Sequence, residues 1–495
     1  MGIIQRQSIK FSLVNLVATL IGVVSIMYIY PKDDELYGYA NMLVSMAYLL
    51  LPFASLGITG VVVRFFREFK DDANNRGFLS LVLFISLVSN LIFVLAFYLF
   101  KGQFYAFVDI FGNSQVLEQN ETVILLIVIL ISLSSIFISF ASNLKRIVIP
   151  SLIQTFSYKI YLPIIFLICY SGYISWKSFS YLIVIFYVIT LLALVFYLKH
   201  LGGLKFGWYP EAFRKKWKEI ARYLSYNSLT SLGSSLTFRL DSVMIPILIG
   251  YASNGLYNMV YFMANVINIP TNSVYQISNP IVSQSIENQD FAHIEEVYKK
   301  SSTNLFLVGS YLFVGMMVCL PDLFQLSVKP ESFAGGMSIF LFLGLGKIVD
   351  MITGTNGAII AYSAYYRYNL WFILLLGLSN VVLNYILITD YGVSGAAMAT
   401  FISISIYNIL KLFLIYFKFN MHPFSIATVK IGILFSIILI IASYLPSVDS
   451  HILNIVYKGG LITLLSTLGA YYLHISEEAN NIIDNLISKK NNSPH

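Results

Sequence analysis

Residues 121–142 read ETVILLIVILISLSSIFISFAS, and stretches of this kind decide the fold. Glu121 is the single charged residue in this stretch. A helix of about 20 apolar residues is long enough to cross the roughly 30 Å hydrocarbon core of a bilayer. Comparable runs recur from one end of the chain to the other, with no polar stretch long enough for a separate soluble domain. The sequence therefore predicts an all-α integral membrane protein with one membrane domain.

The composition supports this interpretation. The 495 residues are 58% hydrophobic and 11% charged, with a mean hydropathy of +0.77, whereas soluble domains carry roughly 25% charged residues.

The first apolar run, residues 8–30, is too long for a signal-peptide core, so we expect a retained helix. Cys169 and Cys319 lie in apolar runs without a neighbouring His or Cys, which argues against a metal site or a disulfide framework.

About fourteen transmembrane helices are predicted, an even number that places both termini on one side. The predicted spans are residues 8–30, 36–58, 77–100, 121–142, 148–171, 177–198, 223–250, 254–282, 301–321, 337–360, 369–389, 393–417, 425–446 and 453–474.

The lysines and arginines of the connecting segments predict the orientation. Of 31 such residues, 23 fall in segments on the side of the N-terminus, three lie deep in spans and five fall on the other side. The five are Lys32, Lys101, Lys177, Lys329 and Lys458. Cytoplasmic loops carry the excess of basic residues, so both termini are predicted in the cytoplasm. This asymmetry also accounts for the net charge of +7 without a nucleic-acid partner.

An internal repeat predicts the domain organisation. A shift of 220 residues lays Leu36 and Tyr37 over Leu256 and Tyr257, and the first predicted helix over the seventh. Repeats of this kind are common in transporters. We therefore predict an N-lobe of six helices at residues 1–200, a linker at 201–222, a C-lobe of six helices at 223–418, and two further helices with a cytoplasmic tail at 419–495.

The linker has the pattern of an amphipathic helix. Pro210 suits a first helical turn, and Phe213, Trp217 and Ile220 recur at spacings of three and four residues. Basic residues occupy the other faces. We expect a cytoplasmic helix on the inner leaflet, with a solvated basic loop as the alternative.

Motifs of enzymatic chemistry are absent from the sequence. There is no G-x-x-x-x-G-K-[ST] loop for ATP, and no Ser, His and Asp constellation or metal-ligand spacing. We therefore predict a protein that is not an enzyme and needs no cofactor. Any energy for transport must come from a gradient or from another subunit.

Five charged residues lie deep in predicted spans: Lys159, Arg239, Asp241, Lys347 and Asp350. Each costs roughly 2.5–3.5 kcal/mol at the bilayer centre, so each should face protein or water. These residues are candidates for lining a transport pathway. Three basic residues against two acidic ones favour an anionic substrate.

Structural roles remain open for the same residues. Lys347 and Asp350 are three residues apart and can neutralise each other on one helix. Arg239 and Asp241 diverge by about 200° around a helix, so they cannot share one partner face. Lys159 either lines a cavity or pairs with another helix.

Two segments resemble a known family. Residues 35–40, ELYGYA, resemble the outer turn after the first helix of bacterial polysaccharide flippases of the Wzx type, with residues 255–257, GLY, as the second-half counterpart. Residues 391–400, YGVSGAAMAT, are similar to the family's G-x-x-G-A-A-x-A-T segment, whose small residues allow close helix packing. These flippases belong to the multidrug/oligosaccharidyl-lipid/polysaccharide exporter superfamily. Residues 172–179, the corresponding turn of the first half, depart from the G-A-A pattern.

The resemblance implies a MATE-like fold of two six-helix lobes around a central cavity, plus two C-terminal helices. It implies alternating-access transport of a polyprenyl-pyrophosphate-linked oligosaccharide across the bacterial cytoplasmic (inner) membrane, for a surface polysaccharide such as O-antigen. It assigns Arg239, Lys159 and Lys347 to substrate binding in the cavity, and Asp241 and Asp350 to proton or sodium coupling. The lipid-linked oligosaccharide and the bilayer are the implied partners, with polysaccharide-assembly proteins as further candidates.

Other functions remain as alternatives. A MATE-type drug antiporter favours twelve helices and a cavity dominated by carboxylates, which the three intramembrane bases argue against. A lipid II flippase shares the fold and the helix count. A membrane enzyme is a further alternative, but the sequence has no catalytic cluster for one. A scaffold that transports nothing is the last alternative, and it would not need five charges at the midplane.

Overall fold

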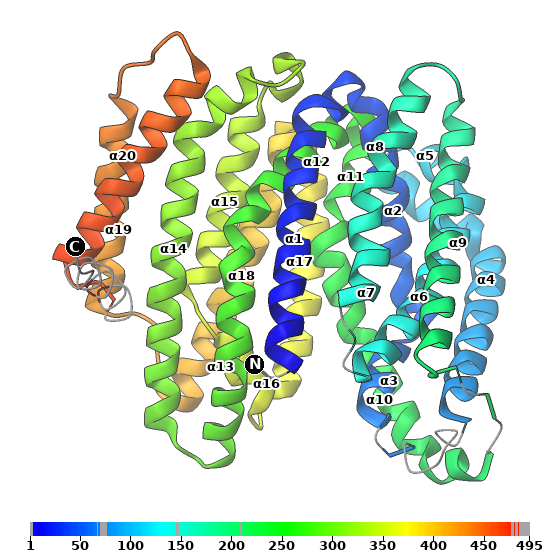
Figure 1. Cartoon of the computed structure of the whole chain (residues 1–495). Coiled ribbons are helices and arrows are strands. Elements are labelled where there is room, and N and C mark those ends of the chain that lie inside the picture. The colour runs from blue at the N-terminus through cyan, green and yellow to red at the C-terminus, as the bar shows by residue number, and fades with distance from the viewer. Residues whose placement is uncertain are drawn as a thin grey trace, which may run out of the picture. The chain divides into compact units, whose positions relative to one another are not determined.

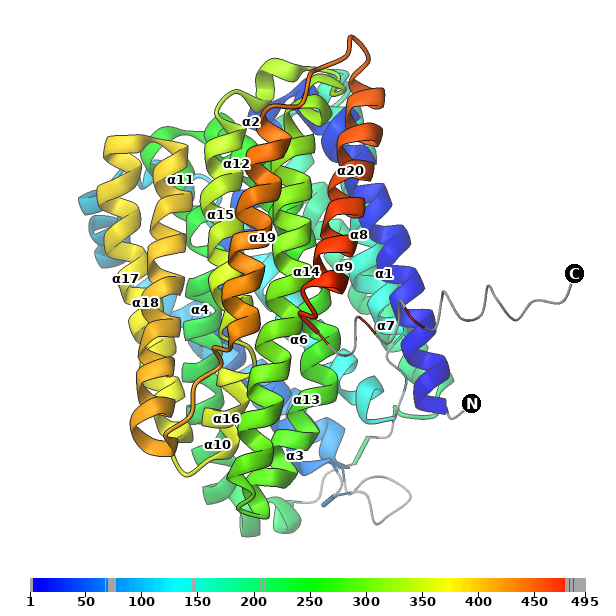
Figure 2. The same ribbon diagram turned by 90° about the vertical axis from the view of Figure 1, so that its left-hand side faces the viewer.

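The computed structural model describes residues 3–66, 68–69, 77–144, 146, 148–204, 206–207, 210–476, 480 and 484. Every regular element in these ranges is a helix, as Figures 1 and 2 show. The prediction of an all-α fold is therefore confirmed. The chain packs into two compact units, Met1–Asn258 and Met259–His495.

The first unit contains the helices up to the beginning of α12. They are α1 (Ile3–Tyr28), the 3-10 turn η1 (Tyr30–Lys32), α2 (Asp34–Ser55), α3 (Ile58–Phe65), α4 (Phe78–Phe111), α5 (Gln115–Glu118), α6 (Glu121–Asn143), α7 (Val148–Ser151), the π-helical turn η3 (Leu152–Phe156), α8 (Ser157–Tyr170), α9 (Trp176–His200), α10 (Pro210–Arg239) and α11 (Asp241–Ile249).

The second unit follows from α12, which begins in the first unit. Its helices are α12 (Tyr251–Ala264), the 3-10 turn η4 (Asn265–Asn268), α13 (Ile269–Glu287), α14 (Phe291–Gln325), the 3-10 turn η5 (Pro330–Phe333), α15 (Gly336–Ile352), α16 (Asn356–Tyr362), α17 (Tyr366–Tyr391), α18 (Val393–Phe419), α19 (Ile426–Ser443) and α20 (His451–Tyr472).

Every predicted span coincides with helical residues. Some of the helices, however, are too short, too polar or too bent to count as a single membrane span. Among the described residues, 10 helices are long and apolar enough to cross a membrane, or up to 12 if the two bent pairs count as one span each. Two of the fourteen predicted spans, those at α1 and at α12–α13, are not among these helices. The total of fourteen spans therefore remains a prediction.

Each bent pair joins a longer helix to a shorter one across a break. The axis of α10 turns by 48° into α11 around Leu240, and α15 turns by 52° into α16 across residues 353–355. Gly354 has φ of +54°, in the left-handed region that favours glycine. These interruptions fall next to four of the five predicted intramembrane charges.

The predicted linker helix starts where expected but does not end at its predicted boundary. It begins at Pro210 and continues without interruption through Arg239 as α10. Ile220 is buried in the core of the first unit with residues of α3, α4, α6 and α9, whereas Trp217 is 45% exposed. The side chain of Phe213 lies outside the described residues. This helix is thus anchored to the unit at Ile220.

The last two helices, α19 and α20, pack against α14. Asp322 of α14 is buried and accepts hydrogen bonds from Lys458 Nζ at 3.1 Å and from Asn454 Nδ2 at 2.9 Å, both on α20. His451 Nδ1 lies 2.9 Å from the same carboxylate. A buried charge is stable when it is paired and hydrogen-bonded in this way. The cluster fixes α20 to the second unit.

The turn between α17 and α18 confirms the close packing predicted for residues 391–400. A Cβ atom at Gly395 would overlap the carbonyl oxygen of Leu387 in α17. Ala396, Ala397 and Ala399 are completely buried. Small residues let helix backbones approach closely in a membrane.

Replacement of Gly395 by alanine should therefore destabilise the second unit. The added methyl group forces α17 and α18 apart, at a cost of about 1–3 kcal/mol. We expect a lower melting temperature of the detergent-purified protein, measured by intrinsic fluorescence. The matched control is Gly432→Ala in α19, where no atom lies within 4 Å of the new Cβ. Equal melting temperatures for the two variants would contradict the packing argument.

Candidate functional site

Arg239 ends α10 and lies over the ring of one tyrosine, near two others. Its guanidinium lies 4.5 Å from the ring centroid of Tyr48 on α2. It also interacts electrostatically with Tyr158 of α8 and Tyr187 of α9. A cation over an aromatic face is stabilised by the ring quadrupole. We call Arg239, Tyr48, Tyr158 and Tyr187 the arginine–tyrosine cluster.

The arginine–tyrosine cluster supplies no counterion. Within the described ranges, Arg239 forms no ion pair and donates no hydrogen bond. A guanidinium has five N–H donors in a planar fork that matches phosphate and carboxylate oxygens. The cluster can therefore hold an anionic group without first breaking a salt bridge.

Asp241 starts α11, two residues after Arg239, and has a different partner. The buried carboxylate accepts a short hydrogen bond from the hydroxyl of Tyr257 on α12. Arg239 and Asp241 thus belong to different helices, with Arg239 at the end of α10 and Asp241 at the start of α11. The interruption also suits both charges, because a cation stabilises the C-terminus of one helix and an anion the N-terminus of the next.

An amide network continues from α11 to α2. Ser242 Oγ lies 3.0 Å from Asn258 Oδ1, and Asn258 Nδ2 donates to the side chain of Asn254 at 2.8 Å. Asn254 Nδ2 in turn donates to the carbonyl of Gly38 at 2.7 Å. This network connects the site of Asp241 to the ELYGYA segment.

The ELYGYA segment and its second-half counterpart pack against each other. A Cβ atom at Gly38 would overlap the carbonyl oxygen of Tyr251, and one at Gly255 would overlap that of Asp34. The two glycines therefore permit a backbone crossing between the beginnings of α2 and α12. The sequence resemblance identified both glycines without predicting that they meet.

Lys159 lies on α8, directly after Tyr158 of the arginine–tyrosine cluster. Its side chain is half-buried. The structure thus places Lys159 on one of the helices that surround Arg239.

Lys347 and Asp350 lie in the second unit and contact separate partners. Lys347 is 8% exposed, and its Nζ lies 5.7 Å from the ring centroid of Tyr261. Asp350 accepts a hydrogen bond from Asn408 Nδ2 at 3.3 Å. The ion pair that their spacing allows is not formed within the described residues.

Asn408 of α18 holds the interruption between α15 and α16. Besides donating to Asp350, its Oδ1 accepts from Thr353 Oγ1 at 3.0 Å and from Asn356 Nδ2 at 2.9 Å. The side chain is completely buried. Asn408 thereby satisfies polar groups on both sides of the break.

Neighbouring helices satisfy the backbone of the same break. Tyr275 of α13 donates to the carbonyl of Gly354 at 3.0 Å, and Ser302 of α14 donates to that of Ile352 at 2.6 Å. A buried carbonyl without a partner is costly, so these bonds stabilise the bend.

Lys411 is a buried base that the sequence analysis missed, because it was counted with the inner connecting segments. It lies on α18, is 5% exposed, and places Nζ 3.8 Å from the ring centroid of Tyr407. Thr400, Asn408 and Lys411 fall within about 80° of one another on α18. That polar stripe is the signal that could have identified Lys411.

Metal ligation has no candidate in the part of the chain that the structure describes. No group of three His, Cys, Asp or Glu residues could hold a metal ion there. Proton or sodium coupling through Asp241 or Asp350 therefore remains a prediction.

Asn408→Ala should destabilise the second unit, because it removes the partner of the Asp350 and Asn356 side chains and one of the two acceptors of Thr353 Oγ1. Each buried polar group left without a partner costs about 1–3 kcal/mol. We expect the melting temperature to fall by several degrees. Ser405→Ala is the matched control on the same helix, because Ser405 bonds the carbonyl of Phe401 in its own helix. A melting temperature equal to that of the control would show that the break is held by other contacts.

Comparison with known proteins relates this arrangement to a family and to solved structures. The family model described as polysaccharide biosynthesis protein matches residues 6–286. No curated protein matches the chain.

Two solved structures show the fold. The chain is similar to lipid II flippase MurJ in its inward closed conformation, with a TM-score of 0.70 and 16% identity, over 94% of this chain and 100% of that one. It is also similar to the inward-facing conformation of a multidrug resistance MATE family transporter of the MOP superfamily, with a TM-score of 0.59 and 14% identity, over 83% of this chain and 94% of that one. The predicted MATE-like fold is therefore confirmed.

Proposed function

The chain belongs to the family of polysaccharide biosynthesis proteins, and from this premise we propose that it is a flippase for a polyprenyl-pyrophosphate-linked oligosaccharide. In this proposal it moves the lipid-linked glycan across the bacterial cytoplasmic membrane by alternating access. The product serves a surface polysaccharide such as O-antigen.

The arginine–tyrosine cluster is the observation that carries this proposal. A cation at the middle of a span is costly, and Arg239 has aromatic neighbours but no carboxylate within ion-pair distance among the described residues. A pyrophosphate can accept two parallel N–H bonds from a guanidinium, which an ammonium cannot donate. Arg239 would therefore bind the charged end of the lipid carrier.

The other buried bases extend the anionic preference. Lys159 adds a second positive charge near the cluster, and Lys347 and Lys411 contribute two in the second unit. We assign the pyrophosphate to Arg239 and Lys159 of the first unit, and Lys347 and Lys411 are separate anion-binding candidates within the second unit. A drug antiporter for cationic compounds would have little use for them.

The two carboxylates are our candidates for coupling. Asp241 and Asp350 each lie beside a helix interruption and accept a hydrogen bond from an uncharged side chain. Binding of a proton or a sodium ion would change the charge at the break, and with it the hydrogen bonds that hold the bend. Both termini would lie in the cytoplasm, where polysaccharide-assembly proteins are candidate partners.

Deletion of the gene in its host tests the function. We expect loss of the surface glycan and accumulation of polyprenyl-linked repeat units, because the units are made in the inner leaflet but not moved. Mass spectrometry of extracted lipids and staining of surface polysaccharide measure the two effects. Expression of the wild-type chain should reverse both.

Two outcomes would replace the proposal. Normal surface glycan with raised drug accumulation would indicate the antiporter. Accumulated lipid II with arrested cell-wall synthesis would indicate the lipid II flippase.

Substitution of Arg239 tests the residue that carries the proposal. Arg239→Ala should lower glycan export by roughly 10- to 100-fold, the factor that corresponds to loss of a charge-assisted hydrogen bond. Arg239→Lys should restore export only in part, because an ammonium cannot bind bidentately. Export is measured as surface glycan per unit of membrane-inserted protein.

Arg64→Ala is the matched control. Arg64 also lies over a tyrosine, with its guanidinium 4.7 Å from the ring centroid of Tyr223, but it is exposed and paired with Glu219 at 3.3 Å. Its removal should leave export unchanged. Full export by a normally abundant Arg239→Ala protein would refute the assignment.

A further inference from the structure

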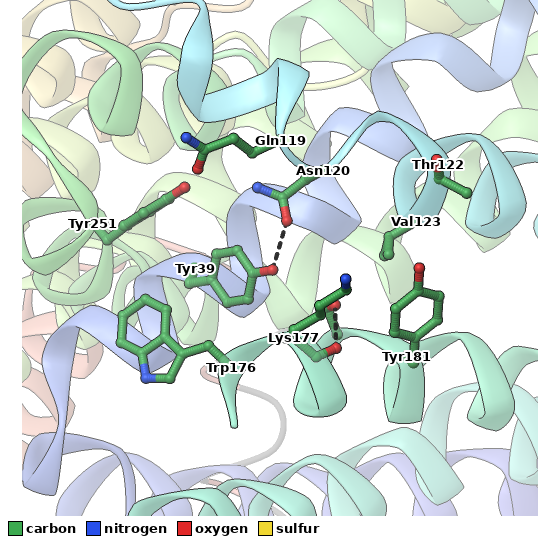
Figure 3. Close-up of a pocket in the computed structure, with 10 residues that line it drawn as sticks. Tyr39, Gln119, Asn120, Thr122, Val123, Trp176, Lys177, Tyr181 and Tyr251 are labelled. Carbon is green, nitrogen blue, oxygen red and sulfur yellow. Dashed lines mark hydrogen bonds between the residues drawn. The ribbon is translucent and has the colours of Figure 1, made fainter. Parts of the chain in front are cut away.

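A cavity of about 490 Å³ lies at one end of the helices of the first unit, away from the arginine–tyrosine cluster. Figure 3 shows side chains from α2, α9, α12 and the segment before α6 around it. Its lining includes Tyr39, Asn120, Trp176, Lys177, Tyr181 and Tyr251. The volume is in the range of small-molecule sites, about 300–1,000 Å³.

Three aromatic rings form one wall of the cavity. The ring centroid of Tyr39 lies 5.2 Å from that of Trp176 and 5.4 Å from that of Tyr251. Trp176 and Tyr251 are 6.2 Å apart. The rings are inclined to one another by 31°, 80° and 60°, so the wall presents both aromatic faces and polar edges. The C–H face of a sugar ring can pack on one such aromatic face.

Polar groups lie beside the rings. Tyr39 donates to Asn120 Oδ1 at 2.6 Å, and Figure 3 shows Tyr39 between Trp176 and Asn120. Within the described residues, Lys177 forms no ion pair. The hydroxyl of Tyr251 adds a further hydrogen-bond donor to the lining. Amide, hydroxyl and ammonium groups together match the hydroxyls and ring substituents of a sugar.

The simplest alternative is an aromatic belt at the membrane surface, where Trp and Tyr are enriched. Tyr39 does not fit a belt, because it is 5% exposed and its hydroxyl bonds an amide from a residue 81 positions away. Tyr173, in the turn before α9, is 85% exposed and has the character of a belt residue. The cavity residues are thus organised around Tyr39 rather than toward lipid.

We propose that this cavity is a carbohydrate subsite that holds a pyranose ring of the transported glycan. The proposal rests on the flippase function and extends it to a specific site for the sugar. The cavity is lined by residues in or beside the predicted outer segments at 101–120 and 172–176, so the glycan would meet it on the outer side. Lys177 would favour a sugar that carries a carboxylate.

The binding test uses a protein whose single tryptophan is Trp176, with the other three of the four tryptophans replaced by phenylalanine. The probe is the repeat-unit oligosaccharide released by mild acid from the host's polyprenyl-linked glycans. We expect a saturable change in tryptophan emission. Tyr39→Ala and Asn120→Ala should weaken binding about three- to tenfold, as loss of one aromatic or hydrogen-bonded contact does.

Two controls separate a sugar site from other occupants. Tyr173→Ala should leave the affinity unchanged, whereas equal losses for Tyr173→Ala and Tyr39→Ala would indicate a belt and overturn the proposal. sn-Glycerol 3-phosphate represents a lipid headgroup. Saturation by this compound but not by the oligosaccharide would also overturn it.

Export in the host distinguishes failure of the subsite from failure of the flippase function. Trp176→Ala should reduce surface glycan severalfold at normal protein abundance, and Tyr173→Ala should not. If gene deletion removes the glycan but the oligosaccharide leaves Trp176 emission unchanged, the subsite alone is refuted. If deletion leaves the glycan normal, the flippase function itself is refuted.

Discussion

The interior of a bilayer offers no water to backbone N–H and C=O groups, so every interruption of a helix there needs partners from protein. This constraint explains why the described chain is helical throughout and where its polar residues gather. Across residues 353–355, Tyr275 and Ser302 bond the exposed carbonyls while Asn408 bonds the flanking side chains. The bend exists because three neighbouring helices supply its hydrogen bonds.

The same constraint concentrates charge at the interruptions. Arg239 and Asp241 flank the break at Leu240, each at the helix end whose dipole it complements. Asp350 lies one turn before the second break and bonds Asn408. A helix that must bend within the membrane thus already contains groups able to bind an anion or to respond to a cation. If the proposed function holds, transport chemistry and helix geometry depend on the same residues.

The length and apolarity of the runs predicted the helices, and helical periodicity predicted that Arg239 and Asp241 diverge. Periodicity could not predict their partners, because Tyr48 is distant from Arg239 in the sequence. The interruption between α10 and α11 could not be predicted either, because no glycine marks it. The burial of Lys411 was not predicted, because a lysine near the end of a span is usually a cytoplasmic anchor. The polar helices α12 and α13 carry so many Asn, Ser and Thr residues that hydropathy alone does not identify them as spans.

The ELYGYA segment combines a packing residue, Gly38, with a residue of the proposed sugar subsite, Tyr39. Gly38 lets the beginning of α2 approach the carbonyl of Tyr251, and this approach brings Tyr39, the next residue, against the ring of Tyr251. Any larger residue at Gly38 would separate the two helices and with them the two rings. The glycine is therefore required for the backbone crossing, and the tyrosine beside it becomes part of the aromatic wall as a consequence.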